Sequence, residues 1–445
     1  MSPKSARRDF LKQSSALGVA WWVGSSNAGW TQPSSSLETI RFACIGVDGR
    51  GLSDRDDAGR HGEIVALCDV DSERLDKAAA RYPKAKKFTD YRKLFDEVGN
   101  EFDAITVSTP DHSHALAAIR GLRMGKHCFV QKPMSYTVAE ARLMREIAAE
   151  KKLCTQMGNQ GSASNGLREA VELIRRGDLG QVKEIHIWTD RPKWPQGQGR
   201  PEKPEPVPMT LNWDVFLGPA PVRPYSSVYH PFKWRGWIDF GTGALGDMAC
   251  HTMNMSVMAL QLFDPISVES TPDPEWTGDL KKESYPKFCT IKYEFGPRGN
   301  LAPCTLYWYE GGKHPLEELH SPIKQGASGS LVIGEKGKMY SDNDYHSTYT
   351  LLPRESFPDD YKKPEIVQSP GHFTEFANAI KESKPALAMS NFEYAGRLTE
   401  TVLLGNIALR AGGKVDWDGV NMKVTNNPAA QQYVTREYRK GWEVA

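Results

Sequence analysis

Two residues in the C-terminal half have the types and the spacing of an acid–base pair. Asp247 and His251 lie four positions apart in the run GTGALGDMACHTMN (residues 241–254), which has the pattern of a helix. Side chains four apart share one face of a helix, so the carboxylate and the imidazole would project together. An imidazole can take the proton of a substrate hydroxyl near neutral pH. The structural alternative is a capping Asp247 and a packed His251.

A glycine-rich turn near the N-terminus has most of the pattern that binds a dinucleotide. In Gly46-Val47-Asp48-Gly49-Arg50-Gly51, the fingerprint G-x-G-x-x-G would require glycine at positions 46, 48 and 51. Asp48 occupies the second position, where the backbone normally approaches the pyrophosphate and a carboxylate would repel it. Gly49 keeps the loop flexible, and Arg50 is placed to neutralise phosphate charge. A tight turn without a ligand is the alternative.

An acidic residue stands at the distance expected for the ribose of the same nucleotide. Asp69 ends the second apolar run, eighteen residues after Gly51, where a carboxylate would accept a hydrogen bond from the ribose 2′-hydroxyl. Val70 and Asp71 follow, so no arginine stands directly beside it to pair with a 2′-phosphate. The spacing therefore favours NAD over NADP. The alternative is that Asp69 starts a turn or caps the next helix together with Asp71.

The histidines raise the question of a metal site. His112 and His114 are two positions apart, but neither they nor the Asp247–His251 pair has a third convincing ligand nearby. We therefore expect no metal. Asp111 or Ser113 is expected to cap the helix that starts there, with His114 lying over the cofactor.

The elements that would position these residues alternate between strand and helix. The strand-like runs TIRFACIGV, GEIVALCDV, FDAITVST and KHCFVQKP are separated by helical patterns such as SERLDKAAARY. This alternation predicts an α/β fold with a doubly wound parallel sheet, a Rossmann domain. Lys132 ends one of these runs beside Pro133, at the sheet edge where ligands bind and where a lysine can stabilise a developing alkoxide.

Length and composition exclude several functional classes. The 445 residues suffice for two domains, and 56 Lys and Arg against 55 Asp and Glu leave no field that favours nucleic acid or anionic lipid. No apolar run reaches eighteen residues, so we expect no membrane span in the mature chain. Seven cysteines without a C-x-x-C pair indicate buried thiols.

The first thirty residues have the features of an export signal. Arg7-Arg8 precedes Phe10-Leu11-Lys12, and a mildly apolar stretch leads to the small-residue site Ser26-Asn27-Ala28, as in a Tat signal. The alternative is a short amphipathic helix that belongs to the fold. We therefore predict export by the Tat machinery to the periplasm, and we divide the chain into a signal (1–30), a linker (31–37), a Rossmann domain (38–157) and a substrate-binding and oligomerisation domain (158–445).

Motifs along nearly the whole chain after the signal resemble those of the Gfo/Idh/MocA oxidoreductases, a family that includes glucose–fructose oxidoreductase, inositol dehydrogenase and family 109 glycosidases. The motifs are the glycine turn, Ser108–His114, Val130–Pro133, Gly158–Gly161, GTGALGDMACHTMN and EYAGRLTETVLLGNIALR. The chain looks most similar to a Tat-exported branch that carries Gln-Lys-Pro in place of Glu-Lys-Pro.

The resemblance implies a fold for the second domain. It should be an α+β domain whose large, mostly antiparallel sheet has one open face toward the nicotinamide and through which members commonly form homo-oligomers. The runs QVKEIHIWTD, PISVESTPD, KFCTIKYEF and CTLYWYE are compatible strands. Helices are expected near 164–176, 244–262, 372–382 and 391–410.

The resemblance also implies roles for individual residues. Lys132 would contact the nicotinamide ribose and stabilise the substrate alkoxide, and His251 would be the general base. Asp247 would hold a neighbouring hydroxyl or orient the imidazole, and Asn254 stands where many members have Asp. NAD would be bound by Gly46, Gly49, Arg50, Gly51, Asp69, Thr109, His114, Gln131, Lys132 and Asn159.

The substrate implied by the resemblance is a small carbohydrate: a sugar, a polyol or a glycoside. A segment dense in aromatic and cationic residues precedes the catalytic helix, and from it we expect Arg191, Trp194 and Tyr229 near the substrate. Because an exported enzyme has no free NAD(H) to exchange with, the cofactor should stay bound. The reaction would be sugar oxidation–reduction or, alternatively, redox-neutral glycoside cleavage. A non-catalytic sugar-binding protein is the third possibility.

Overall fold

The computed structural model describes residues 39–444. The predicted export signal and linker (1–37) lie outside the described residues, so their assignment stays a prediction. In the described part of the chain, no helix is both long and apolar enough to cross a membrane. The seven cysteines are free and buried, as their apolar surroundings in the sequence indicated.

Six parallel strands form the first sheet, in the order β3-β2-β1-β4-β5-β6. The order reverses between β1 and β4, which creates a switch point at the carboxyl ends of these two strands. The strands are β1 (Ile40–Ile45), β2 (Gly62–Cys68), β3 (Lys86–Phe88), β4 (Ala104–Val107), β5 (His127–Val130) and β6 (Thr155–Met157).

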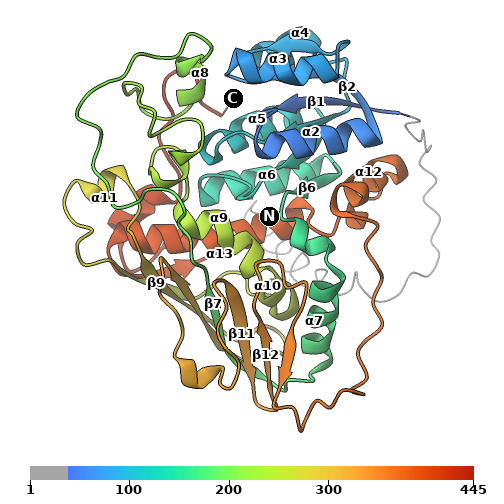
Figure 1. Ribbon diagram of the computed structural model, residues 1–445, viewed down its shortest axis with the longest axis vertical. Coiled ribbons are helices and arrows are strands. Elements are labelled where there is room, and N and C mark those ends of the chain that lie inside the picture. The colour runs from blue at the N-terminus through green and yellow to red at the C-terminus, as the bar shows by residue number, and fades with distance from the viewer. Residues whose placement is uncertain (1–38, 445) are drawn as a thin grey trace, which may run out of the picture. The chain divides into compact units, whose positions relative to one another are not determined.

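Helices cover both faces of this sheet (Figure 1), which confirms the predicted doubly wound Rossmann fold. One face packs against α2 and α3, and the other against α4, α5 and α6. A later helix, α12, also packs on the first face, where Phe373 contacts Phe42 and Phe129 of β1 and β5. The helices are α2 (Arg50–His61), α3 (Ser72–Arg81), α4 (Tyr91–Val98), α5 (Asp111–Arg123), α6 (Val138–Glu150) and α12 (His372–Glu382).

The second sheet has nine strands, in the order β13-β12-β11-β7-β10-β9-β8-β14-β15. Neighbours are antiparallel except β7 and β10, which are parallel, so the predicted mostly antiparallel sheet is confirmed. The strands are β7 (Val182–Trp188), β8 (Ser267–Pro272), β9 (Cys289–Phe295), β10 (Cys304–Glu310), β11 (Gly329–Gly334), β12 (Lys338–Ser341), β13 (Thr350–Leu352), β14 (Lys414–Asp418) and β15 (Lys423–Val424).

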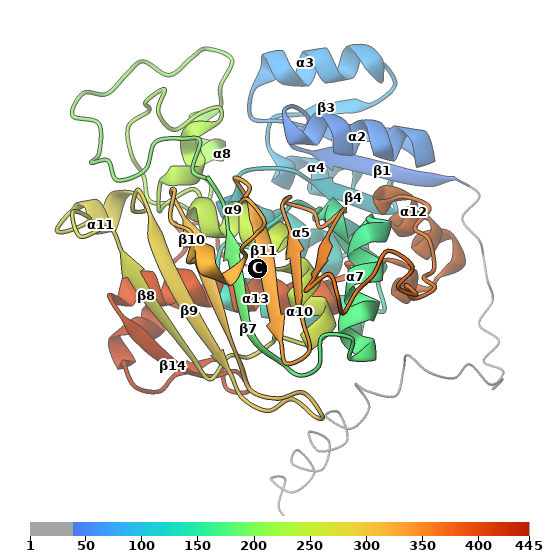
Figure 2. The same ribbon diagram turned by 60° about the horizontal axis from the view of Figure 1, so that its bottom comes forward.

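The two faces of this sheet differ in burial. Alternate residues of β9 and β10 are buried, because one face packs against α13 (Phe392–Ala411), which lies behind the sheet in Figure 2. The other face is less buried and carries a stack of His186, Tyr307 and Tyr309. The predicted helix near 244–262 is two helices, α9 (Gly243–Thr252) and α10 (Asn254–Leu260); the remaining helices are α7 (Asn165–Arg176), α8 (Trp213–Leu217) and α11 (Leu280–Glu283).

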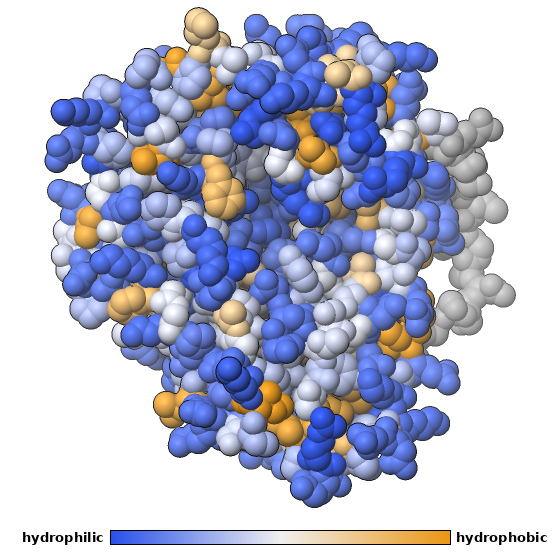
Figure 3. All heavy atoms as spheres, viewed as in Figure 1, coloured by the Kyte–Doolittle hydropathy of each residue, from blue (hydrophilic) through white to orange (hydrophobic). Residues whose placement is uncertain are grey.

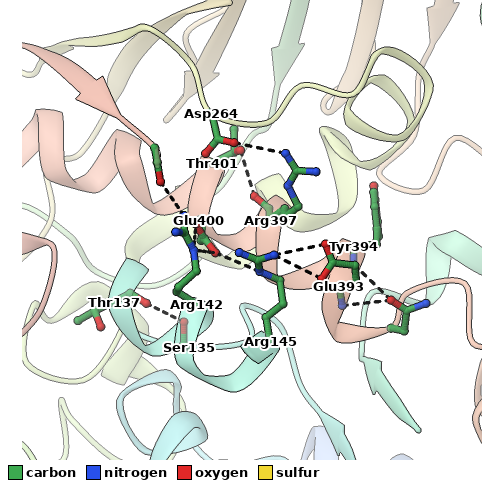
Figure 4. Close-up of polar contacts among 12 residues, drawn as sticks. Ser135, Thr137, Arg142, Arg145, Asp264, Glu393, Tyr394, Arg397, Glu400 and Thr401 are labelled. Carbon is green, nitrogen blue, oxygen red and sulfur yellow. Dashed lines mark hydrogen bonds and ion pairs between the residues drawn. The ribbon is translucent and has the colours of Figure 1, made fainter. Parts of the chain in front are cut away.

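Buried ions tie the long helix α13 to α6 of the first domain. The Nε atom of Arg142 on α6 donates to Glu400 of α13 at 2.9 Å, and Arg145 lies 3.7 Å from the same carboxylate (Figure 4). The side chains of Arg142 and Glu400 are only 12% and 6% exposed. This packing holds the helix that supports the second sheet against the nucleotide-binding fold.

Candidate active site

A cavity of about 540 Å³ opens at the carboxyl ends of β1, β2, β4 and β5, the position where open parallel sheets bind ligands. Figure 3 shows the hollow in the surface among largely hydrophilic side chains. One end is lined by the glycine turn and Asp69, and the other by residues after β7 and from α9. The cavity therefore joins the predicted nucleotide site to the predicted catalytic helix.

The turn after β1 is shaped by its glycines. Gly46 has φ +78°, and a Cβ there would lie 2.6 Å from the carbonyl oxygen of Ser108, which directly follows the neighbouring strand β4. A Cβ on Gly51 would lie 2.1 Å from the carbonyl oxygen of Gly46. These two positions require glycine for a close approach of backbone, as the fingerprint predicts.

The residues at this end suit a dinucleotide. Gly49 has φ +59°, and a Cβ built there meets no atom within 4 Å, so the turn leaves room for a phosphate at the N-terminus of α2. Arg50 opens that helix beside the cavity. Asp69 presents a carboxylate at the end of β2, and it accepts hydrogen bonds from the backbone N–H groups of Val47 and Asp71 at 3.0 Å each. Burial raises the pKa of Asp69 and these two bonds oppose the rise.

Helix α3 is capped by Asp71, whose side chain accepts from the N–H of Glu73. Asp69 therefore is not the cap, and its carboxylate faces the cavity. The carboxylate of Asp48 lies 2.7 Å from the guanidinium of Arg74 on the first turn of α3, so the acid that interrupts the fingerprint has a cation beside it.

Strand ends β4 and β5 supply the central part of the cavity lining. Gln131 donates through Nε2 to Asp54 at 2.8 Å. This bond fixes the side chain of Gln131 to α2, the helix that follows the glycine turn. His114 bridges the carbonyl oxygens of Thr109 and Pro133 at 2.7 and 2.8 Å. Thr109, His114, Gln131 and Lys132 line the cavity.

The expected cap of α5 is wrong. The helix begins at Asp111 after Pro110, and in the described residues no side chain caps it, because proline carries no acceptor in its side chain. The carboxylate of Asp111 instead accepts from the N–H and the hydroxyl of Thr242, at 3.0 and 2.5 Å. Asp111 thus ties α5 to the start of α9, which carries the predicted catalytic pair.

Lys132 and Asp247 meet at the wall of the cavity. The Nζ atom of Lys132 lies 2.6 Å from Oδ1 of Asp247 and 2.7 Å from its carbonyl oxygen, and Nε of Arg235 donates to the same Oδ1 at 3.0 Å. Burial alone would raise the pKa of Asp247, but the two cations hold it below the usual range of a carboxyl. Asp247 is therefore ionised, and it fixes both cations at the cavity wall.

His251 lies one helical turn beyond Asp247 and lines the same cavity. It is 4% exposed, and its Nδ1 has no hydrogen-bond partner among the described residues. Burial, and then the nearby charge of Lys132, lower the pKa of His251 well below its ordinary value, so the imidazole is neutral at pH 7. The predicted orientation of the imidazole by Asp247 is not observed within residues 39–444, because that carboxylate binds Lys132 and Arg235.

The ring of Tyr345 packs against His251 instead. The two ring centroids are 5.1 Å apart in an edge-to-face arrangement. Tyr345 lies in the connection from β12 to β13, where Asn343 Oδ1 accepts from the N–H groups of Tyr345 and Ser347. Buried His346 anchors this connection through Ser330 of β11 at 2.8 Å. The loop is thus pre-arranged to present Tyr345 to the cavity.

Three residues predicted at the ligand lie outside the cavity lining. Asn159 lies behind the cavity, where its amide bonds to Ser390 and to the carbonyl oxygen of Cys250. Trp194 packs against Phe232 and donates to Gln196, and Tyr229 is enclosed in an aromatic cluster. The cavity lining contains Arg191 but not these three side chains, because other protein groups surround them.

Asn254 is also structural. Its amide donates to Ser162 and its oxygen accepts from Tyr394, so it lies in the support behind the cavity. The cavity lining also contains residues that were not predicted as site residues: His230, Phe232, Trp234, Arg235, Asp344 and Tyr345. Arg235 and Trp234 belong to the aromatic and cationic segment noted in the sequence, whereas Tyr345 carries no local signal of its position.

Comparisons with known proteins find similarity in both parts of the chain. Residues 40–159 match the family model described as "Oxidoreductase family, NAD-binding Rossmann fold", and residues 188–280 match "Oxidoreductase family, C-terminal alpha/beta domain". A glycosyl hydrolase family 109 protein of Solibacter usitatus is 29% identical over 195 residues, which are 40% of this chain and 44% of that protein. An inositol 2-dehydrogenase of Salmonella typhimurium is 28% identical over 128 residues, 28% of this chain and 37% of that protein.

The chain thus spans less than half the length of these curated relatives. Among solved structures, the WlbA dehydrogenase of Bordetella pertussis in complex with NADH and UDP-GlcNAcA has a TM-score of 0.58 at 16% identity, covering 85% of this chain and 99% of that one. An inositol dehydrogenase homologue of Azotobacter vinelandii with NADH and myo-inositol has a TM-score of 0.57 at 17% identity, covering 86% and 98%. At these identities the likeness shows the fold.

Proposed function

Because the chain belongs to the Gfo/Idh/MocA family of oxidoreductases, we propose that it is an NAD-dependent oxidoreductase that acts on a hydroxyl of a sugar, a polyol or a glycoside. The observation that carries this proposal is the convergence of Lys132, Asp247 and His251 on one cavity whose other end is the nucleotide turn. Relatives whose names specify inositol dehydrogenase support a carbohydrate substrate.

The three residues have complementary parts in such a reaction. His251, neutral at pH 7, accepts the proton of the reacting hydroxyl. Lys132, fixed by Asp247 at 2.6 Å, stabilises the negative charge that develops on the substrate oxygen. Asp247 is a positioning residue for Lys132 and Arg235. NAD, when bound, supplies the hydride acceptor.

The cellular setting is part of the same proposal. The twin-arginine segment at Arg7-Arg8 supports Tat export to the periplasm, with NAD loaded before export and retained afterwards. The less buried sheet face with His186, Tyr307 and Tyr309 supports a homo-oligomer. Cell fractionation and light scattering of the purified protein test these two points, and a cytoplasmic monomer would refute both.

A second candidate is a redox-neutral glycosidase that cleaves a glycosidic bond without net formation of NADH. The observation that favours it is the set of relatives named glycosyl hydrolase family 109, which are 29–30% identical over 156 to 195 residues. The same base and lysine would serve it, because both reactions begin at a ring hydroxyl.

The decisive experiment starts with the purified protein, which is denatured so that released NAD(H) can be measured. Absence of NAD(H), together with no binding of added NAD, would refute the enzyme proposal. Incubation with p-nitrophenyl glycosides then separates the two candidates. Release of nitrophenol without net NADH supports the glycosidase, and NADH or keto-sugar without cleavage supports the dehydrogenase. Sugar binding without either product would identify a non-catalytic binding protein.

His251→Ala should abolish turnover and leave NAD binding intact. The matched control is His314→Ala, an exposed histidine outside the cavity lining, which should leave turnover unchanged. Full activity of the His251 variant would remove it as the base.

A further inference from the structure

One ion pair joins the two loops at the nucleotide end of the cavity. Nη1 of Arg74, on the first turn of α3, lies 2.7 Å from Oδ2 of Asp48 in the turn after β1. Nε of Arg74 also lies 3.5 Å from Asp71, which caps α3. Asp48 and Arg74 both line the cavity, with side chains 38% and 28% exposed. The two side chains thus form an ion pair at the position where a dinucleotide would enter.

Arg74 reduces the repulsion that the carboxylate of Asp48 would exert on a pyrophosphate. Asp48 occupies the second glycine position of the fingerprint, where the backbone normally approaches the pyrophosphate. The N-terminus of α2 and Arg50 make this turn attractive to phosphate, and an unpaired carboxylate would work against them. The guanidinium at 2.7 Å offsets much of that charge, although Asp71 at 3.5 Å shares the same cation. With Arg74 in place, the turn keeps its attraction for the pyrophosphate.

Asp48 has the converse effect on Arg74. An arginine close to the end of β2 is the residue type that accommodates the 2′-phosphate of NADP. Here Asp48 and Asp71 flank Arg74, so its charge is already balanced. Asp69 adds to the discrimination, because two backbone N–H groups hold its carboxylate at the ribose position and it would repel a 2′-phosphate.

We infer that Asp48 and Arg74 act as one selectivity pair that sets the preference for NAD over NADP. Arg74 offsets much of the charge of Asp48 and permits the pyrophosphate to bind, while Asp48 occupies Arg74 and withholds it from a 2′-phosphate. The inference rests on the proposed function only in its premise that the cavity binds a dinucleotide. On this inference, Asp48 at the second glycine position contributes to the recognition of the cofactor.

The test is a double-mutant cycle read by nucleotide binding. Asp48→Asn, Arg74→Gln and the double variant are purified, and affinities for NAD and NADP are measured by calorimetry at two ionic strengths. Nucleotide extracted from each protein after expression is also identified by mass spectrometry. Arg74→Gln should weaken NAD binding about fivefold, as expected for loss of a partly exposed ion pair, and the double variant should recover most of that loss. Asp48→Asn should leave NAD affinity near wild type and raise NADP affinity about fivefold.

The predicted effects should shrink at the higher ionic strength, because salt screens exposed charges. Arg41→Gln is the matched control: Arg41 pairs with Asp103 at the same 2.7 Å but does not line the cavity, so both affinities should stay unchanged. If Arg74→Gln fails to fold, Asp48→Asn and Arg74→Lys carry the test, and Arg74→Lys should behave as wild type.

Unchanged NAD and NADP affinities in Asp48→Asn and Arg74→Gln, or losses that add in the double variant, would overturn the inference. These outcomes differ from failure of the proposed function. That failure would appear as wild-type protein that binds no dinucleotide or that binds NAD and converts no carbohydrate, whatever the variants do.

Discussion

Two buried carboxylates in this protein, Asp247 and Glu400, each lie close to two cations. The cations beside Asp247 line the cavity, whereas those beside Glu400 bind other protein groups. Asp247 accepts from Lys132 and Arg235 at 2.6 and 3.0 Å. Glu400 accepts from Arg142 at 2.9 Å and lies 3.7 Å from Arg145 (Figure 4). The side chains of Asp247 and Glu400 are 12% and 6% exposed. A buried carboxylate with two cations thus occurs in two settings.

The setting decides what each cluster can do. Arg142 also donates to the carbonyl oxygen of Gly419 and Arg145 reaches Glu393, so these cations bind protein groups between α6 and α13. Lys132 and Arg235, by contrast, both line the cavity. Removing one partner from a cluster closed by protein groups leaves a buried charge unpaired and destabilises the fold. A cluster open to a cavity keeps charge available for chemistry.

The largest effect is expected from removing the closed carboxylate. Glu400→Ala leaves Arg142 buried without its partner, which should lower the free energy of unfolding by about 3–5 kcal/mol. Urea denaturation measures the change, and activity per folded molecule should stay within about twofold. The control is Glu393→Ala, whose side chain is 63% exposed and whose loss should cost less than about 1 kcal/mol. An equal loss of unfolding free energy in Glu400→Ala and Glu393→Ala would contradict a special structural role for the buried Glu400 cluster.

At the cluster of Asp247, Lys132 and Arg235, a substitution should reduce turnover more than stability. Lys132→Met removes the donor that stabilises the substrate oxygen, and kcat should fall about 10²–10³-fold. Stability should fall less than in Glu400→Ala, because Asp247 keeps Arg235 and borders a cavity that water can enter. Steady-state kinetics and urea denaturation of the same preparation check both halves. A variant that unfolds as readily as Glu400→Ala would make Lys132 chiefly structural.

Arg235 should have a smaller effect on turnover. Only its Nε is bonded to Asp247, and its guanidinium stacks 4.2 Å from the ring centroid of Trp234. Arg235→Gln removes a charged donor from the cavity wall, so kcat/KM should fall about tenfold or more. Unchanged kcat/KM would show that Arg235 faces the cavity without serving the substrate.

The smallest effect concerns pH. In the proposed reaction the neutral form of His251 is the base, and burial and the charge of Lys132 lower its pKa. Protonation therefore occurs only below the ordinary histidine pKa of about 6.5. We expect kcat/KM to change less than about twofold between pH 8 and 6.5 and to fall only at lower pH. An acidic limb centred above pH 6.5 would contradict the assignment of His251.

Local patterns in the sequence predicted the framework of the site. The glycine turn, Asp69 and Lys132 stand at strand ends, and Asp247 and His251 are spaced by one helical turn. Short-range geometry predicted these positions, and the family resemblance was needed to assign Lys132, Asp247 and His251 to the site. Asn159, Trp194 and Tyr229 were placed at the ligand by residue type and by resemblance, and the fold buries them elsewhere. A residue type that binds sugars also packs well in a core, and only the packing separates the two.

Tyr345 illustrates what no local pattern contains. It reaches His251 because a loop between two strands of the second sheet is anchored through His346 and extends to the cavity at the carboxyl ends of the first sheet's strands. The position of such a residue depends on how the two sheets are placed, which is a property of long-range packing.

The sequence by itself determined the glycine turn after β1, the acid that follows β2 and the shared helix face of Asp247 and His251, because each depends on spacing within one element or one βα unit. It also identified Asp48 as the residue that interrupts the fingerprint. Only the tertiary structure decided what Asp48 does. The carboxyl ends of parallel β1 and β2 lie side by side, which brings the turn after β1 to the start of α3 and places Arg74 at 2.7 Å. Charge compensation between residues far apart in the chain is thus decided by strand pairing.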